Sequence, residues 1–209
     1  MSYVSCWNPR VIFTEEYFCG GLANYRDYLR DHRFPRVADA LVKVFDLRGK
    51  TVLDCGCAVP YLVDELRRRG VDAVGFDISD YCKEKTKREG LRWFLQADAR
   101  FIPFRDRSFY LVIASELVEH VPPEFEDLLL RELTRVSARF LLVRTPPMRF
   151  PDDCDQTHVN IRPHMYWVTR IEDLGFIHRD DLFEAYMRIG KKEFELFFDE
   201  FLVFERVRA

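Results

Sequence analysis

The stretch KTVLDCGCAVPYL, residues 50–62, decides the fold of this chain. Its apolar run at residues 51–53 is typical of a strand buried on both faces, and Asp54 ends that run. A turn of small residues follows, and from Pro60 onward apolar residues recur at helical spacing. A strand, a small-residue loop and a helix in this order form the entry of a nucleotide-binding α/β unit. We therefore expect a parallel sheet with this strand near its centre.

The chain then repeats the same pattern. Residues 73–77 and 92–98 are apolar runs that again end in an acid, Asp77 and Asp98. Residues 109–114 and 139–143 predict a fourth and a fifth strand, with helices at about 60–69, 80–89, 123–133 and 161–174. Residues 176–186 and 201–207 predict two closing strands without a clear helix between them. These elements predict an α/β, Rossmann-like, doubly wound seven-stranded sheet, mostly parallel with a C-terminal antiparallel hairpin and helices on both faces.

No change of composition or low-complexity linker divides the 209 residues, so we expect a single domain. Within it, residues 1–48 form a helical lead-in, 49–145 the sheet core, and 146–209 a long loop, a helix and the closing hairpin. The lead-in is rich in aromatic residues and contains a helix predicted from about Pro35 to Asp46. Such a segment covers an edge of the sheet or the mouth of a ligand site; alternatively its aromatic side chains only fill the core.

Composition restricts the partners of the chain. The formal net charge of −3 gives no overall attraction to nucleic acid or to an anionic membrane, and no apolar run approaches the roughly 18 residues that span a bilayer. The six cysteines are scattered and form no CxxC pair, which favours small buried side chains over a disulfide framework. We expect a soluble, cytoplasmic protein without membrane contact, with nucleic acid an unlikely substrate. The oligomeric state is not predicted.

Acidic residues at the strand ends indicate the ligand. In an open α/β sheet the ligand lies outside the carboxyl ends of the strands, and Asp77 follows the turn at close to the spacing of roughly 20 residues expected for an acid that binds ribose hydroxyls. A pyrophosphate needs free backbone N–H groups at the turn, whereas this turn has one glycine, Gly56, followed by Ala58 and by Pro60, which has no N–H. The turn therefore favours an adenosine that carries an amino acid and a sulfonium over a dinucleotide.

Five motifs in a fixed order carry a family resemblance. They are VLDCGC at 52–57, VGFD at 74–77, QADA at 96–99, IPF at 102–104 with DRSF at 106–109, and SELVEH at 115–120. Together they resemble class I S-adenosylmethionine-dependent methyltransferases, and most closely the methyltransferase-11-like group. The resemblance covers about residues 50–145, with a looser likeness between His158 and Phe176. The chain departs from the family pattern at Ala58 and Pro60, where glycine is common, and at Tyr110, where aspartate is usual.

The resemblance implies an enzyme that transfers a methyl group from S-adenosylmethionine and releases S-adenosylhomocysteine. Asp54, Gly56, Cys57 and Ala58 would line the methionine part of this cofactor. Asp77 and Ile78 would hold the ribose, Asp98 and Ala99 the adenine, and Ser115 and Glu116 would face the sulfonium and the acceptor. The acceptor is expected to be a small molecule, and the sequence does not indicate whether its nitrogen, oxygen, sulfur or carbon receives the methyl group.

Methyl transfer from a sulfonium depends largely on alignment, and a base is needed only if the acceptor loses a proton. His120 and His158 are the candidates for that catalytic role, although each has an equally good structural interpretation. The candidates for the acceptor pocket are Tyr17, Tyr25, Tyr28, Arg162 and Trp167. No metal is expected, because the acids that accompany His158 in its loop, Asp152, Asp153 and Asp155, are typical of a solvated cluster.

Two alternatives to a small-molecule enzyme stay open at this stage. Methylation of RNA or protein is one, although no basic strip with interleaved aromatic residues supports it. The other is a non-catalytic protein with a methyltransferase fold that binds a cofactor or a partner. The substitutions Ala58 and Pro60 in the turn motivate this second alternative.

Overall fold

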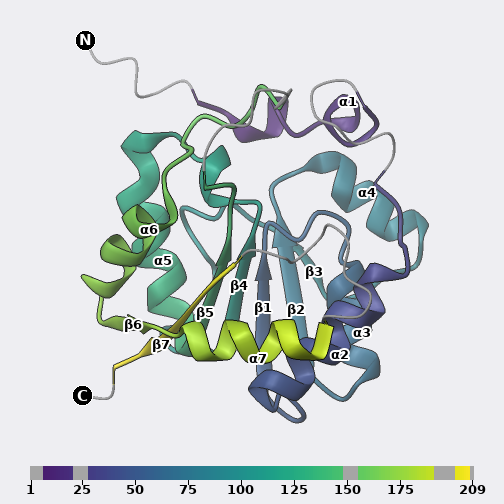
Figure 1. Ribbon diagram of the computed structural model, residues 1–209. Helices are drawn as coiled ribbons and strands as arrows, with labels where there is room; N and C mark the ends of the chain where they lie inside the picture. Colours follow the sequence, from purple (N-terminus) through teal and green to yellow (C-terminus); the bar gives the residue numbers. More distant parts are fainter. Residues whose placement is uncertain (1–6, 21–27, 148–154, 191–200, 208–209) are drawn as a thin grey trace.

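The computed structural model describes residues 7–20, 28–147, 155–190 and 201–207, and within these ranges seven strands form one sheet (Figure 1). The order across the sheet is β3-β2-β1-β4-β5-β7-β6. Strands β1 to β5 pair in parallel, while β7 is antiparallel to both of its neighbours, β5 and β6. The strands are β1 Thr51–Cys55, β2 Asp72–Asp77, β3 Phe94–Gln96, β4 Phe109–Ser115, β5 Ser137–Arg144, β6 Phe176–His178 and β7 Leu202–Arg206.

Helices cover both faces of the sheet, as the sequence predicted. Side chains of α2 (Arg33–Phe45), α3 (Tyr61–Arg68), α4 (Asp80–Arg88) and α7 (Asp180–Gly190) share one hydrophobic core, and those of α5 (Glu126–Val136) and α6 (His164–Glu172) share the other (Figure 1). Successive strand residues point to opposite faces, so Val52 belongs to the first core and Leu53 to the second. The central strands are buried on both faces, which explains their continuous apolar runs.

The strand order reverses between β1 and β4, since β2 and β3 lie on one side of β1 while β4 and β5 lie on the other. This reversal is the place where open α/β sheets bind their ligands. Above the strand ends at this point runs the N-terminal segment, which includes the 3₁₀ turn η2 (Pro9–Val11) and the short helix α1 (Glu15–Phe18) (Figure 1). Two further 3₁₀ turns, η3 (Val118–His120) and η4 (Pro123–Phe125), follow β4.

One part of the predicted architecture is wrong in detail. Residues 176–186 were expected to be one strand, but β6 ends at His178 and α7 begins at Asp180, so a helix connects the two antiparallel strands. The physical reason is visible in the sequence, because Leu182, Phe183, Tyr186 and Met187 recur at helical spacing and pack in the same core as α2. The predicted third strand is also shorter than expected, since Trp93 has a φ of 63° and pairing begins at Phe94.

The helices that the sequence predicted, α2 to α6, begin and end within about three residues of the predicted positions. None of the helices in the described ranges combines the length and the apolar character that crossing a membrane requires.

Candidate functional site

A cavity opens at the carboxyl ends of β1, β2, β3 and β4 and encloses about 1070 Å³ of empty space, counted out to its open mouth. All the residues that the sequence assigned to a cofactor lie in its wall: Asp54, Gly56, Cys57, Ala58, Asp77, Ile78, Asp98, Ala99, Ser115 and Glu116. Aromatic side chains of the N-terminal segment form its roof: Trp7, Phe13, Tyr17, Phe18, Tyr28 and Phe34.

The turn after β1 is tied to the end of β2. Gly56 has a φ of 68°, and a Cβ atom at this position would lie 3.1 Å from the side chain of Leu117. Ala58 also has a left-handed backbone, with a φ of 50°, and its N–H donates to Oδ2 of Asp77 at 2.9 Å. Pro60 is the residue that precedes α3, where its missing N–H costs nothing. The turn therefore folds without the glycines that are common in the methyltransferases the sequence resembles.

Two buried carboxyl groups, Asp54 and Asp77, lie at the centre of the cavity wall. Burial raises the pKa of Asp77, while the backbone N–H groups of Ser79, Ala58 and Ile78 oppose that rise. The N–H of Ser79 donates to Oδ1 of Asp77 at 2.8 Å. Burial, together with the charge of Asp77, raises the pKa of Asp54 to about 7. A ligand with a positive charge beside these groups would favour their ionised forms.

Asp98 is the third acid of the wall, and the guanidinium of Arg100 already pairs with it. Nη2 of Arg100 lies 2.6 Å from Oδ2 of Asp98, and the backbone N–H of Arg100 donates to Oδ1 at 2.9 Å. The same guanidinium lies over the rings of Trp7 and Phe125, at 4.6 Å from each ring centre. Arg100 thus fixes the orientation of the Asp98 carboxylate and links the roof to the wall. The sequence analysis did not single out Arg100.

At the opposite end of the cavity lies Glu116, which forms an ion pair with Arg144 and has a left-handed backbone with a φ of 52°. The next titratable residues, Glu119 and His120, belong to η3. The His120 side chain lines the cavity, whereas Glu119 is fully buried behind it. Among the described residues neither carboxyl oxygen of Glu119 has a hydrogen-bond partner. Burial first, and then the charge of Glu116, raises the pKa of Glu119 well above its ordinary value.

Hydrogen bonds from a distant loop hold His120 in place. Its Nδ1 lies 2.8 Å from the hydroxyl and 3.3 Å from the carbonyl oxygen of Thr157. The hydroxyl of Thr157 donates to Oδ1 of Asp155 at 2.6 Å, and the hydroxyl of Tyr17 donates to Oδ2 at 3.2 Å. Asp155 was predicted to be solvated, and this prediction is wrong because its carboxylate is buried and accepts these bonds. Asp152 and Asp153 lie outside the described residues.

The structure brings together only some of the other predicted residues. Tyr17 and Tyr28 line the cavity, and the ring centre of His158 lies 4.9 Å from that of His120, although His158 is not in the cavity wall. Tyr25 lies outside the described residues. Arg162 and Trp167 are not at the cavity: Arg162 donates to Asn160, and Trp167 is fully buried on the inner face of α6. The apolar face of α6 has to pack on the sheet, which explains the position of Trp167.

Comparisons with known proteins agree with this architecture. A family model described as a methyltransferase domain matches residues 28–172. The ubiquinone biosynthesis O-methyltransferase of Hahella chejuensis is 33% identical over 82 residues, which are 36% of this chain and 34% of the relative. The fatty-acid O-methyltransferase of Mycolicibacterium smegmatis is 34% identical over 97 residues, which are 44% of this chain and 34% of the relative. The chain thus matches about a third of the length of these relatives.

Solved structures show the same fold. The magnesium protoporphyrin IX methyltransferase of Synechocystis PCC 6803, crystallised with bound S-adenosylmethionine, superposes with a TM-score of 0.66 at 16% identity, over 97% of this chain and 99% of that one. A SAM-dependent methyltransferase from Archaeoglobus fulgidus gives a TM-score of 0.59 at 18% identity, over 93% and 97% of the two chains. Because the family model spans well over half of the sequence and the sheet order and cavity agree with it, the chain belongs to the methyltransferase domain family.

Proposed function

We propose that this protein is an S-adenosylmethionine-dependent methyltransferase that acts on a small-molecule acceptor. The observation that carries the proposal is the convergence of Asp54, Asp77 and Asp98 on one cavity at the point where the strand order reverses. Membership in the methyltransferase domain family supports it, as does the bound cofactor of the Synechocystis structure. Together with the net charge of −3, the cavity with its aromatic roof favours a small acceptor in the cytoplasm over nucleic acid.

The residues of the cavity suit this cofactor. Asp77 accepts the N–H of Ala58 on one oxygen and that of Ser79 on the other, and a carboxylate has about four lone-pair sites, so acceptor capacity is left for the ribose hydroxyls. Asp54, with Gly56, Cys57 and Ala58, would hold the methionine part, whose ammonium group favours ionised Asp54. Asp98, Ala99 and Ile78 would surround the adenine. Ser115 and Glu116 would face the sulfonium end.

The acceptor would bind between the sulfonium end and the roof, against Tyr17, Tyr28 and His120. The cofactor supplies a methyl group already activated by a sulfonium, so the chain has to align the acceptor and exclude water. The matching curated relatives are O-methyltransferases, which favours an oxygen acceptor. A hydroxyl acceptor loses its proton on methylation. We assign that deprotonation to His120 and His158. Tyr25 stays a prediction for the acceptor pocket.

Calorimetric titration with S-adenosylmethionine and with S-adenosylhomocysteine tests the proposal. Asp77→Ala should weaken the binding of both ligands at least tenfold, because the two ribose hydroxyls lose their charged hydrogen-bond acceptor. Asp72→Ala is the matched control, since Asp72 begins the same strand, is exposed and lies at the opposite end from the cavity. Absence of binding by the folded wild-type protein, or unchanged affinity in Asp77→Ala, would contradict the proposal. Release of S-adenosylhomocysteine with a panel of small phenols and carboxylic acids then identifies the acceptor class.

A further inference from the structure

We propose that Glu119, His120 and His158 form a binding site for one divalent metal ion at the acceptor end of the cavity. Each of the three residues offers one ligand atom, and these atoms lie within 4.8 Å of one another. Ligands about 2.0–2.2 Å from a tetrahedral ion are roughly 3–4 Å apart, so small side-chain rotations bring the three atoms to coordination distance. The proposal departs from our sequence-based expectation that no metal is bound.

The backbone already holds the two halves of this site together. Glu119 and His120 lie in η3, whereas His158 comes from the loop before α6. The carbonyl oxygen of Glu119 accepts the N–H groups of both Val159 and Asn160, each at 2.9 Å. His158 therefore lies next to a segment that is fixed to η3, and the ligands do not depend on a loop having to close.

The side chain of Glu119 provides an independent indication of a cation. It is completely buried, and among the described residues neither of its carboxyl oxygens has a hydrogen-bond partner of good geometry, although the hydroxyl of Thr145 and the charge of Arg144 act on it. Burial of a polar group without a partner costs on the order of 1–3 kcal/mol, and more for a charged group. Buried charges in proteins are usually paired or bound to metals. An ion between Glu119 and the two imidazoles would supply the missing partner.

The hydrogen bonds of His120 fix the tautomer that a metal ligand needs. The carbonyl oxygen of Thr157 can only accept, and the single hydroxyl proton of Thr157 is donated to Asp155. The proton between His120 and Thr157 must therefore be on Nδ1 of His120. Neutral His120 then has its lone pair on Nε2. Histidines that bind metals usually donate their other ring N–H to an oxygen in this way.

Two imidazoles and one carboxylate favour a transition ion such as Zn²⁺ over Mg²⁺ or Ca²⁺, which prefer oxygen ligands. Three protein ligands leave a position for an acceptor oxygen. With an ion in place, His120 and His158 would act as its ligands in place of the base role given above, and the ion would make an acceptor hydroxyl more acidic, so that water could take its proton. The oxygen would form the new bond to the methyl carbon, and the carbon–sulfur bond would break with its electron pair moving to sulfur. This role rests on the proposed function, whereas binding of the ion does not.

Calorimetric titration of chelator-treated protein with Zn²⁺, without cofactor, tests the site. We expect one ion per chain, and at least tenfold weaker binding in Glu119→Gln, which keeps the buried volume, and in His158→Ala. His178→Ala is the control, because His178 lies in β6 away from the cluster and should bind Zn²⁺ like the wild type. A wild-type protein that binds no Zn²⁺ at equimolar concentration would overturn the proposal, as would unchanged affinity in Glu119→Gln and His158→Ala.

Two further measurements keep this test separate from folding and from the proposed function. Zn²⁺ should raise the thermal unfolding midpoint of the wild type but not of Glu119→Gln, and circular dichroism verifies that the variant is folded. Asp77→Ala should lose cofactor affinity and retain Zn²⁺ affinity. Failure of S-adenosylmethionine to bind would contradict only the proposed function. Co²⁺ bound to the wild type should show a visible spectrum that changes in His158→Ala, and an unchanged spectrum would count against His158 as a ligand.

Discussion

Ala58 has a backbone conformation that suits glycine better than alanine. Its φ of 50° places it in the left-handed region, which costs a residue with a Cβ atom roughly 1–2 kcal/mol. The loop adopts this conformation because the N–H of Ala58 then meets the carboxylate of Asp77. The strain is the local cost of tying the turn to β2.

Replacement Ala58→Gly should therefore stabilise the protein, by a few tenths to about 1 kcal/mol, because relief of strain exceeds the extra entropy that glycine gives the unfolded chain. Urea unfolding monitored by circular dichroism measures the change. Ala97→Gly is the matched control, since Ala97 lines the same cavity but has no positive φ, and it should lose stability. A loss of stability in Ala58→Gly would show that the left-handed conformation carries no strain.

Single residues also show how far the site could be predicted. Asp54, Asp77 and Asp98 were predicted correctly to converge, because each ends a parallel strand and such ends meet at one edge of the sheet. Arg100 and Thr157 were missed. Their importance comes from hydrogen bonds and ring contacts, and Thr157 lies far along the chain from its partner His120. No periodicity or motif encodes such pairings.

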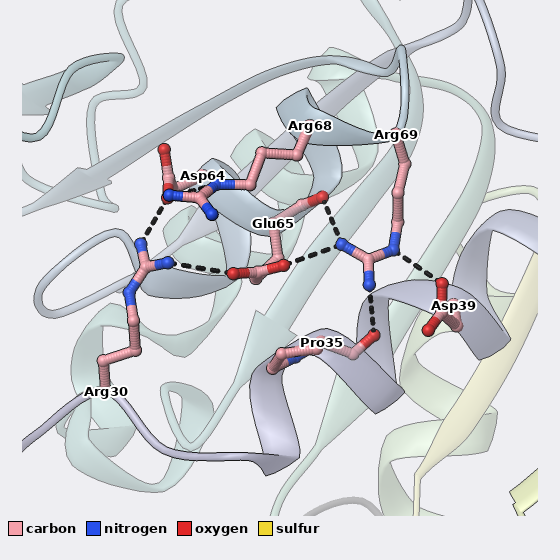
Figure 2. Close-up of polar contacts among 7 residues, drawn as sticks. All are labelled: Arg30, Pro35, Asp39, Asp64, Glu65, Arg68 and Arg69. Atoms are coloured by element: carbon pink, nitrogen blue, oxygen red, sulfur yellow. Dashed lines mark hydrogen bonds and ion pairs between the residues drawn. The ribbon is translucent and has the colours of Figure 1, made fainter.

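At the scale of elements, a network of ion pairs fixes the end of the N-terminal segment to α3 (Figure 2). Arg30 pairs with Asp64 and lies 2.9 Å from Oε1 of Glu65. The other oxygen of Glu65 lies 2.7 Å from Arg69, which also binds Asp39 of α2. Figure 2 shows Glu65 between the two arginines. The network holds the backbone next to Tyr28, whose ring lies 6.0 Å from that of Tyr61 of α3.

Arg30→Ala should weaken S-adenosylmethionine binding a few-fold, because the roof residue Tyr28 loses its adjacent anchor. The stability loss should be small, about 1 kcal/mol or less, since Arg30 is partly exposed. Arg68→Ala removes an exposed arginine that pairs with the same Asp64 but does not reach the N-terminal segment, so it should leave the affinity unchanged. Equal effects of the two variants on calorimetric affinity would show that the network has no influence on the roof.

Elements whose apolar residues recur at one regular spacing were predicted well, whereas a segment in which that spacing changes was not. The helices α2 and α3 bury one face, so their apolar residues recur at helical spacing. The central strands are buried on both faces, so their apolar residues are continuous. The region of β6 and α7 was misjudged as one strand because Phe176 and Ile177 begin a run whose period changes from strand to helix after His178. The apolar residues of α7 that recur at helical spacing pack against α2, and this contact favours the helix.

At the scale of the whole molecule, buried carboxyls should make stability depend on pH. The pKa of Asp54 is raised to about 7 in the folded protein, mainly by burial, against about 3.9 in an unfolded chain. Between these values the folded state binds more protons than the unfolded state, so its stability falls as pH rises. Burial raises the pKa values of Asp77 and Glu119 in the same direction.

The thermal unfolding midpoint of the ligand-free protein should therefore decrease as the pH is raised from about 5 to 8. Asp54→Asn should make the midpoint depend less on pH. Differential scanning calorimetry at a series of pH values measures both. Carboxyls with lowered pKa values, such as Glu132 and Asp181, act in the opposite sense but below this range. A wild-type midpoint that rises from pH 5 to pH 8 would contradict the burial of an unpaired Asp54.

The position of β7 has a consequence for the order in which the protein can fold during synthesis. The chain has supplied strands β1 to β5 by Arg144, so a parallel half-sheet can form early. Within the described residues, β6 pairs only with β7, and β7 is also the strand that joins it to β5. A nascent chain that ends before Leu202 would thus expose the edge of β5 and leave β6 without a strand partner. Ribosomal stalling in this interval should produce an aggregation-prone intermediate.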